Sequence, residues 1–147
     1  MEIVPKQGID KLEFGMQQHH VASIYGNPNH KFEDEEGNEI VLYYPQKLRL
    51  TFYEDEDMKL GYIISSNPDL KLFDQKIIGK TPDEIKLKLE SHGLKSWQQE
   101  EFDMTVTHSN EANWLTLESE FNEIVKVELG AMINENDEFE WKFKAKK

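Results

Sequence analysis

Apolar and polar residues alternate along several short stretches of the chain, which is typical of strands that bury one face. The clearest stretch spans residues 48–53, in which three apolar residues alternate with three others: Leu48, Leu50 and Phe52 with Arg49, Thr51 and Tyr53. In the stretch 60–65, we expect Leu60, Tyr62 and Ile64 on one face of a strand. Further strands are predicted over residues 40–44, 104–107, 114–118, 124–132 and 139–143.

Two short helices are expected among these strands. The first covers residues 17–25 and is ended by Gly26-Asn27-Pro28, because glycine suits the C-terminal cap and proline cannot continue the helix. The second follows Thr81, a favourable N-cap, with Pro82 at the first helical position and Glu84 completing a capping box. Its apolar positions and its terminating glycine are Ile85, Leu87, Leu89 and Gly93.

The two halves of the chain repeat this order of elements. Gly15 and Gly79 each precede a helix, and Leu50-Thr51-Phe52 matches Leu115-Thr116-Leu117 at nearly the same offset. No Gly/Ser-rich linker separates the halves, so we expect one domain, residues 1–147, made of two related halves at about 1–69 and 70–147. The predicted fold is α+β: two tandem α-β-β-β(β) units, with the helices packed on one face of an antiparallel sheet.

The composition limits the compartment and the available chemistry. The chain has 147 residues and no cysteine, which excludes disulfides, thiolate metal sites and cysteine nucleophiles. Residues 1–8 have neither the basic start nor the apolar run of a signal peptide. No stretch approaches the ~20 apolar residues that a bilayer span needs. We therefore expect a cytoplasmic protein.

The charge narrows the class of partner. Lys plus Arg is 17 and Asp plus Glu is 29, so the net charge is −12. A protein needs a basic surface to bind nucleic-acid phosphates or an anionic membrane. The acidic net charge therefore argues against nucleic acid and membrane partners. An acidic protein attracts basic partners instead. The alternative is that the charge serves only solubility.

No catalytic or metal-binding motif is found. His19 and His20 are adjacent, so on a helix they point about 100° apart and do not share one metal. The acidic runs at residues 33–36 and 54–57 lack the spacing of a calcium loop. Phosphate-binding loops, dinucleotide fingerprints and nucleophile elbows are also absent from the sequence. We expect no enzyme activity, no metal and no cofactor.

Aromatic residues suggest a partner-binding surface instead. Strand alternation places Arg49 and Trp114 on the sheet face that points away from the helices, and such residues are common in binding hot spots. The alternative is that another layer covers them. The full set of candidate partner-binding residues is Tyr43, Arg49, Thr51, Tyr53, Trp114, Thr116 and Glu118.

One segment near the N-terminus resembles a known family. Phe14-Gly15-Met16, followed by Val21 and then Gly26-Asn27-Pro28, resembles the opening of β-lactamase-inhibitor-protein-like domains and of the SmpA/OmlA-like outer-membrane lipoproteins. Here Gln17 stands where that family usually has a threonine cap. The resemblance implies that the two units form one sheet with an open face that binds proteins.

These observations favour a non-catalytic protein-binding module. The specific hypothesis is an inhibitor or immunity protein, monomer or weak dimer, that neutralises a basic toxin or enzyme through its sheet face. The first alternative is a small-molecule or lipid-binding protein with a cavity between helices and sheet. The second is an enzyme that uses scattered carboxylates and a histidine, and an uncharacterised bacterial domain of another role is also left open.

Overall fold

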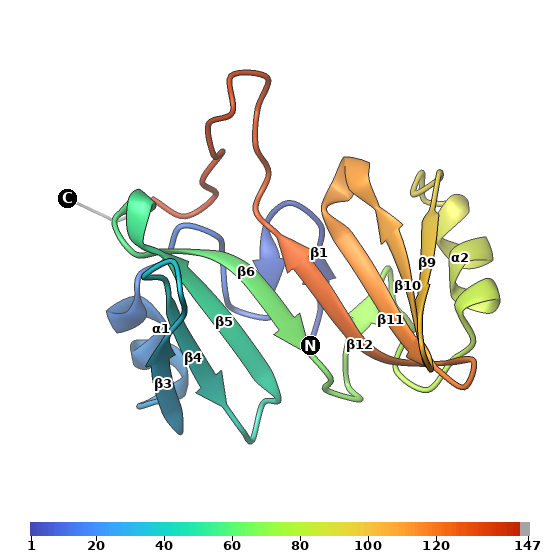
Figure 1. Ribbon diagram of the computed structural model, residues 1–147, viewed down its shortest axis with the longest axis horizontal. Helices are drawn as coiled ribbons and strands as arrows, with labels where there is room; N and C mark the ends of the chain where they lie inside the picture. The colour runs from blue at the N-terminus through green and yellow to red at the C-terminus, as the bar shows by residue number, and fades with distance from the viewer. Residues whose placement is uncertain (145–147) are drawn as a thin grey trace.

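A single antiparallel sheet of eight strands dominates the computed structural model, in which residues 1–144 are described (Figure 1). Across the sheet the strands follow the order β3-β4-β5-β6-β12-β11-β10-β9. The bounds of the first four are β3 (His30–Glu33), β4 (Glu39–Tyr43), β5 (Leu48–Tyr53) and β6 (Lys59–Ser65). The bounds of the other four are β9 (Gln98–Phe102), β10 (Thr105–Asn110), β11 (Leu115–Glu120) and β12 (Glu123–Gly130).

The strands form two meanders that meet at the centre of the sheet. β3 to β6 pair in sequence order, and so do β9 to β12. The meanders are joined by antiparallel pairing of β6 with β12, in which Val127 lies opposite Ser65 and Leu129 opposite Ile63. These four residues are buried, so the junction belongs to the core of the protein.

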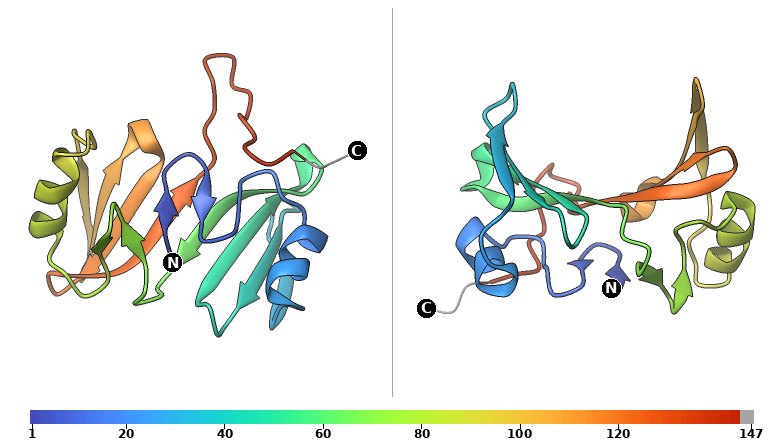
Figure 2. Two further views of the ribbon diagram at one scale, coloured as in Figure 1. Left: turned by 180° about the vertical axis from the view of Figure 1, so that it is seen from behind. Right: turned by 90° about the horizontal axis from the view of Figure 1, so that it is seen from below.

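A second layer covers one face of this sheet. It consists of two helices, α1 (Gln18–Tyr25) and α2 (Pro82–Glu90), and two small hairpins, β1 (Ile3–Val4) with β2 (Gly8–Ile9) and β7 (Lys71–Leu72) with β8 (Gln75–Lys76). The right-hand view of Figure 2 shows all four pieces on the same side of the sheet. One continuous apolar cluster lies between the layers and includes Phe14, Phe52 and Leu117. Neither helix within residues 1–144 has the length and apolar character that a bilayer span requires.

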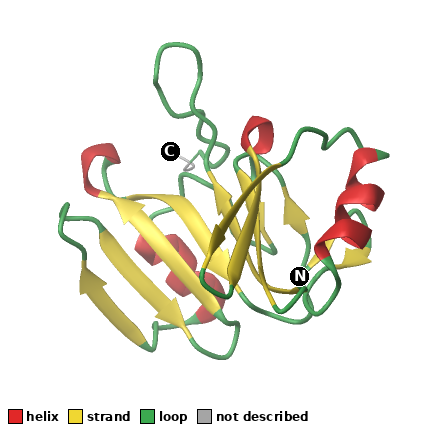
Figure 3. Cartoon of the chain, turned by 45° about the vertical axis from the view of Figure 1, so that its right-hand side comes forward, coloured by secondary structure: helices red, strands yellow, loops and turns green. Residues whose placement is uncertain are grey.

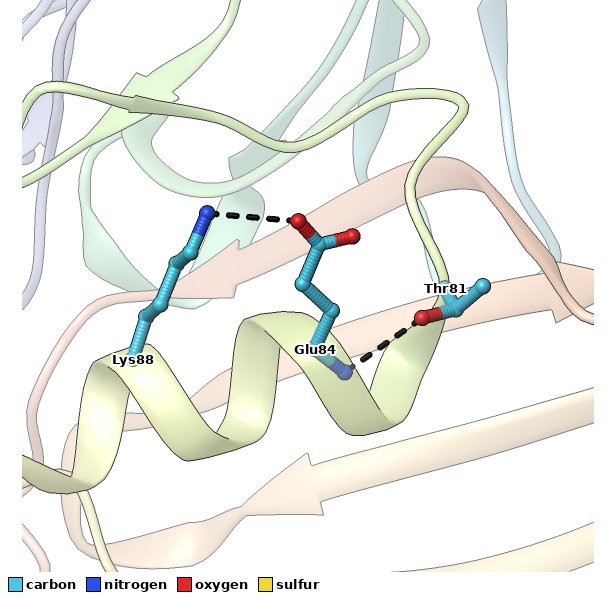
Figure 4. A network of polar contacts seen from close by, with 3 residues as sticks. All are labelled: Thr81, Glu84 and Lys88. Carbon is cyan, nitrogen blue, oxygen red and sulfur yellow. Dashed lines mark hydrogen bonds and ion pairs between the residues drawn. The ribbon is translucent and has the colours of Figure 1, made fainter.

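Helix α2 begins where its sequence predicts, but only the Thr81 half of the predicted capping box is formed, because the Glu84 carboxylate lies near Lys88 instead. The Thr81 side chain accepts a hydrogen bond from the Glu84 amide at 3.4 Å, and Pro82 occupies the first turn. One turn later, Lys88 Nζ lies 3.3 Å from Glu84 Oε1, which adds an exposed i,i+4 ion pair (Figure 4). Leu87 is 71% exposed and points away from the sheet. The helix is therefore held by its cap and by a narrow buried stripe, formed by Ile85 and Leu89.

Helix α1 uses an unusual cap. Gln17 stands at the N-cap, and its backbone amide donates to His20 Nδ1 at 3.0 Å. The Gln17 side chain donates to the carbonyl of Asp57 at 2.7 Å, which ties the start of the helix to the turn between β5 and β6. Histidine at the third helical position thus takes the place of the glutamate of a common capping box.

The predicted fold class is wrong. Residues 1–144 are mostly β: they form one eight-stranded antiparallel sheet and two α-helices, of eight and nine residues, rather than two tandem α-β units (Figure 3). Leu50-Thr51-Phe52 and Leu115-Thr116-Leu117 lie in β5 and β11 of the same sheet, with β6 and β12 between them. The β content was underestimated because β3 and β9 are exposed along their whole length, so no alternation marks them.

A bulge in β6 changes which side chains share a face. Thr51 pairs with Tyr62 and Phe52 with Leu60, so Gly61 has no partner on β5. Leu60 therefore points into the core, whereas Tyr62 points to the opposite face; the expectation that both share one face is wrong. A Cβ atom on Gly61 would overlap with the Tyr53 ring, which lies directly over this glycine.

The chain after β12 crosses the end of the sheet as a strap, residues 132–144. The strand predicted over residues 139–143 is not formed, and Phe139 makes only an isolated bridge with Ile133. The aromatic residues of the strap pack on other elements instead. The centre of the Phe139 ring, for example, lies 5.4 Å from the centre of the Tyr53 ring. The amide of Phe143 donates to the carbonyl of Phe14 at 2.9 Å. Side-chain packing and single main-chain hydrogen bonds, rather than strand pairing, therefore fix the strap.

We predict that Gly61→Ala destabilises the protein by about 1–3 kcal/mol, because the added methyl group must displace the Tyr53 ring. Chemical denaturation of the single variants and of the double variant with Tyr53→Ala measures the coupling. The alanine should cost much less in the Tyr53→Ala background. Equal costs in the two backgrounds would show that the Tyr53 ring is not the obstacle.

Candidate functional site

The sheet face that points away from the helices forms a trough. In the right-hand view of Figure 2, the outer strands at both ends of the sheet rise on the side opposite the second layer. No described helix or strand lies across the middle of this concave face in that view. The strap borders it at one end, where Phe139 packs on Tyr53. The concave face is therefore an open surface with a defined shape.

One register row crosses the whole trough. Directly opposed residues of an antiparallel sheet share a face, so the pairing identifies the members of the row. From β3 to β9 they are His30, Leu42, Arg49, Ile64, Glu128, Thr116, Ser109 and Gln98. In the part formed by β9 to β12, a parallel row adds Lys126, Glu118, Thr107 and Glu100. The surface is thus polar and charged, with isolated apolar positions.

Charges on this face are unevenly distributed. Lys126 is the one cation among the four residues of the second row. Its Nζ lies 3.0 Å from Glu118 Oε2, so its charge is already paired. Arg49 lies over the Phe32 ring at 5.7 Å from the centroid, at the β3 end of the trough. Glu100 and Glu128 belong to the same face, and neither has an ion pair among the described residues. The β9 to β12 side of the trough therefore carries unpaired negative charge.

A pocket of about 600 Å³ opens on this acidic side of the trough. Two aromatic rings, Tyr62 and Trp114, contribute to its wall. The other residues that line it are Gln98, Glu100, Ser109, Asn110, Glu111, Leu115 and Thr116. Ser109 Oγ and Thr116 Oγ1 are 3.1 Å apart and hydrogen-bond across β10 and β11. We call this the Trp114 pocket.

Tyr62 occupies the centre of the sheet between Thr51 and Gly130. Burial of its ring and the neighbouring Glu128 carboxylate raise the pKa of the Tyr62 hydroxyl above its ordinary value. The phenol therefore stays protonated at neutral pH and serves as a hydrogen-bond donor rather than as a general base.

The candidate residues from the sequence divide into three groups. Five of them lie on or at the margin of the concave face: Arg49, Thr51, Trp114, Thr116 and Glu118. Tyr53 is half-buried between Gly61 and Phe139. Tyr43 points the opposite way, into the core, and its hydroxyl donates to the carbonyl of Gly26 at 2.9 Å.

Sequence reasoning missed several residues of the Trp114 pocket. Tyr62 was placed on the same face as Leu60 because the bulge at Gly61 was not recognised, although glycine in a strand is a known sign of a bulge. Gln98 and Glu100 were missed because β9 is polar throughout and was not predicted as a strand. Glu111 lies in the turn before Trp114, and nothing in its sequence context distinguishes it from other exposed glutamates.

Metal binding finds no support among residues 1–144, which contain no group of three histidine, aspartate or glutamate side chains arranged to hold an ion. The acidic run at residues 33–36 spans the end of β3 and the turn after it, in which Asp34 Oδ1 accepts the amides of Glu36 and Asn38 at 2.9 Å each. In the second run, residues 54–56 form a short 3-10 turn and are partly or fully exposed.

One histidine lies in the core rather than at the site. His108 is 4% exposed, its Nε2 lies 3.4 Å from Ser119 Oγ, and its Nδ1 has no hydrogen-bond partner within residues 1–144. Burial, together with the positive charge of Lys86 on α2, lowers the pKa of His108, and the opposing effect of Asp83 is smaller. The side chain is therefore a neutral packing residue at physiological pH.

Comparisons with known proteins show similarity of fold alone. No family model matches the chain, and no curated protein matches it. The crystal structure of the uncharacterized protein YfeY from Escherichia coli is similar, with a TM-score of 0.52, 13% identity, and coverage of 86% of this chain and 98% of that one. An extracellular protein of Bacillus anthracis that contains an SCP domain gives a TM-score of 0.50 and 12% identity, over 88% of this chain and 50% of that one.

These neighbours correct the expected family. The resemblance to β-lactamase-inhibitor-protein-like domains and to the SmpA/OmlA-like lipoproteins is wrong, because the similar structures are of other kinds. The residues of this N-terminal motif have structural roles within this fold. Phe14 is a core residue, Gly15 lies at positive φ against the strap, and Gly26 ends α1. The chain also spans only half the length of the Bacillus anthracis protein.

We predict that His108 makes the protein less stable in mild acid. The unfolded chain binds a proton near pH 6.5 and the folded chain does so only at lower pH, so the free energy of unfolding falls as the pH drops below about 6.5. Denaturant titrations at pH 7.5, 6.5 and 5.5 should show a flatter slope for His108→Leu than for the wild type. His30→Gln is the matched control, because His30 is exposed, and it should keep the wild-type slope.

Proposed function

We propose that this chain is a non-catalytic protein-binding module that captures a basic protein, such as a toxin or an enzyme, on its concave sheet face. The observation that carries the proposal is the uncovered trough, whose register row runs from His30 on β3 to Gln98 on β9. A trough of this kind presents rigidly placed side chains to a convex partner, which lowers the entropy lost on binding.

Charge supports a basic partner. The net charge of −12 attracts cations at long range, and Glu100 and Glu128, which have no ion pair within residues 1–144, place negative charge inside the trough. Electrostatic steering of this kind raises the association rate and makes it depend on salt. Arg49 and the Lys126–Glu118 pair would then help to set the orientation of the partner on the β5 to β12 part of the face.

The alternative of a ligand cavity between helices and sheet has less support. The pocket between α1 and the sheet has about 200 Å³, with Val21, Val41 and Phe52 in its wall. Small-molecule sites usually have about 300–1,000 Å³. The Trp114 pocket is larger but opens on the other face of the sheet, where a protein partner would cover it.

The proposal is tested by exchanging charge on the trough and elsewhere. The double variant Glu118→Lys/Glu128→Lys alters the concave face, whereas Glu35→Lys/Asp55→Lys makes the same change in net charge in two exposed turns. Wild-type protein captures partners from a lysate of its native host, mass spectrometry identifies them, and each one is purified. Its affinity for the wild type and for both variants is then measured by biolayer interferometry at several salt concentrations.

We expect the trough variant to lose at least about tenfold in affinity and the turn variant less than about twofold, because only the first places repulsive charge in the contact. Wild-type affinity should fall as salt rises. Equal losses of affinity in the two variants would show that net charge alone attracts the partner. Failure to find a protein whose affinity depends on the trough would contradict the proposal. Thermal unfolding checks that both variants remain folded.

A further inference from the structure

The Trp114 pocket has the composition of a site for one organic cation. Trp114 and Tyr62 offer aromatic surface, and Glu100 and Glu111 offer carboxylates. Gln98, Ser109 and Thr116 add neutral hydrogen-bonding groups, and none of the nine described lining residues is a lysine or an arginine. An aromatic face next to carboxylates is complementary to a cation that has a flat, weakly hydrated surface.

Trp114 is held in place by its backbone. It follows the 3-10 turn η2 (Glu111–Asn113) and has φ 49° and ψ 42°, a left-handed conformation that is rare for a bulky side chain. Its amide donates to the carbonyl of Glu111 at 3.2 Å, and its carbonyl accepts from the Gly130 amide at 2.9 Å. Unfavourable backbone conformations of this kind are kept where the surroundings determine them, often at binding sites.

The indole ring uses the space above Gly130. A Cβ atom on Gly130 would lie 3.4 Å from Trp114 Cε3 and 3.5 Å from Tyr62 Cδ2, so both rings contact this part of β12. Trp114 nevertheless remains 45% exposed, because it packs on the strand on one side and opens to the trough on the other. The ring is thus positioned before any ligand arrives.

We propose that the Trp114 pocket receives the guanidinium group of an arginine side chain from the basic partner, which stacks on the indole of Trp114 and pairs with the carboxylates of Glu111 and Glu100. This inference rests on the proposed function for the origin of the arginine. Arginine fits better than lysine because its planar group stacks on a ring and hydrogen-bonds to carboxylates in the same plane.

The pocket is tested with a small probe rather than with a protein. N-acetyl-arginine N-methylamide is titrated to about 50 mM at constant ionic strength, and the indole N–H signals of Trp97, Trp114 and Trp141 are followed by NMR. The neutral isostere N-acetyl-citrulline N-methylamide and the lysine analogue are titrated in the same way. Single-tryptophan substitutions assign the three signals.

We expect the Trp114 signal to shift in a saturable manner with the arginine probe. Binding of the citrulline probe should be at least about fivefold weaker and that of the lysine probe at least about twofold weaker, since each loses stacking or charge. Equal shifts with arginine and citrulline, stronger binding of lysine, or no saturable shift at Trp114 would each overturn the inference.

Variants connect the shift to the pocket. Trp114→Leu should abolish saturable binding of the arginine probe, which is monitored in this variant through the backbone amide signals of β10 and β11. Glu111→Gln should weaken binding of the probe at least about threefold. Glu90→Gln removes the same charge from exposed α2 and should leave binding unchanged. An equal effect of Glu90→Gln and Glu111→Gln would show that net charge alone matters. Because Trp114→Leu also changes packing on Gly130, Trp114→Phe is added and should retain partial binding.

The outcome is separable from that of the proposed function. If a basic protein binds the trough but the arginine probe does not shift Trp114, the pocket inference fails and the protein-binding proposal stands. If the probe binds in the pocket and no protein is found whose binding depends on Glu118 and Glu128, the preference of the pocket for a guanidinium group stands and the protein-binding proposal fails.

Discussion

The pairing of β6 with β12 is the constraint on which the rest of the structure depends. It joins two four-stranded meanders into one sheet through a short register that includes Ile63 opposite Leu129 and Ser65 opposite Val127. Because both strands are central, the apolar residues on their inner face contribute to the shared core. The same pairing brings Tyr62 and Glu128 together on the outer face, from strands far apart in sequence. Core and trough are thus two faces of one strand junction.

The parts of the fold that could be predicted are those in which local chemistry decides. Thr81 and Pro82 mark the start of α2, and the alternation around Leu50 marks β5. The parts that failed depend on long-range contacts. Polar β9 is a strand because β10 pairs along it, and the Phe139 segment is no strand because its ring packs on Tyr53. The polar sequence of β9 carries no periodic signal, whereas the alternation of Phe139, Trp141 and Phe143 indicates a strand although Phe139 packs on Tyr53.

The candidate site shows the same division. Arg49, Thr116 and Glu118 could be placed on the outer face because strict alternation holds in β5 and β11 around them. Tyr43 could not be placed in this way, because residues 40–44 are apolar throughout and show no alternation; it lies opposite buried Leu48 of β5 and shares its core face. The pocket itself could not be foreseen, since it combines residues of β6, β9, β10 and β11, and only the sheet order brings these together.

The sheet does not close into a barrel, so within residues 1–144 its outermost strands, β3 and β9, each keep one edge without a strand partner. Such edges are templates on which a second chain can add a strand. On β9, consecutive Glu100 and Glu101 point to opposite faces of the sheet. A second β9 laid antiparallel on the first with Glu100 opposite Glu101 would bring like charges close on both faces at once. The electrostatics of this edge therefore oppose growth of the trough into a longer sheet made of several copies.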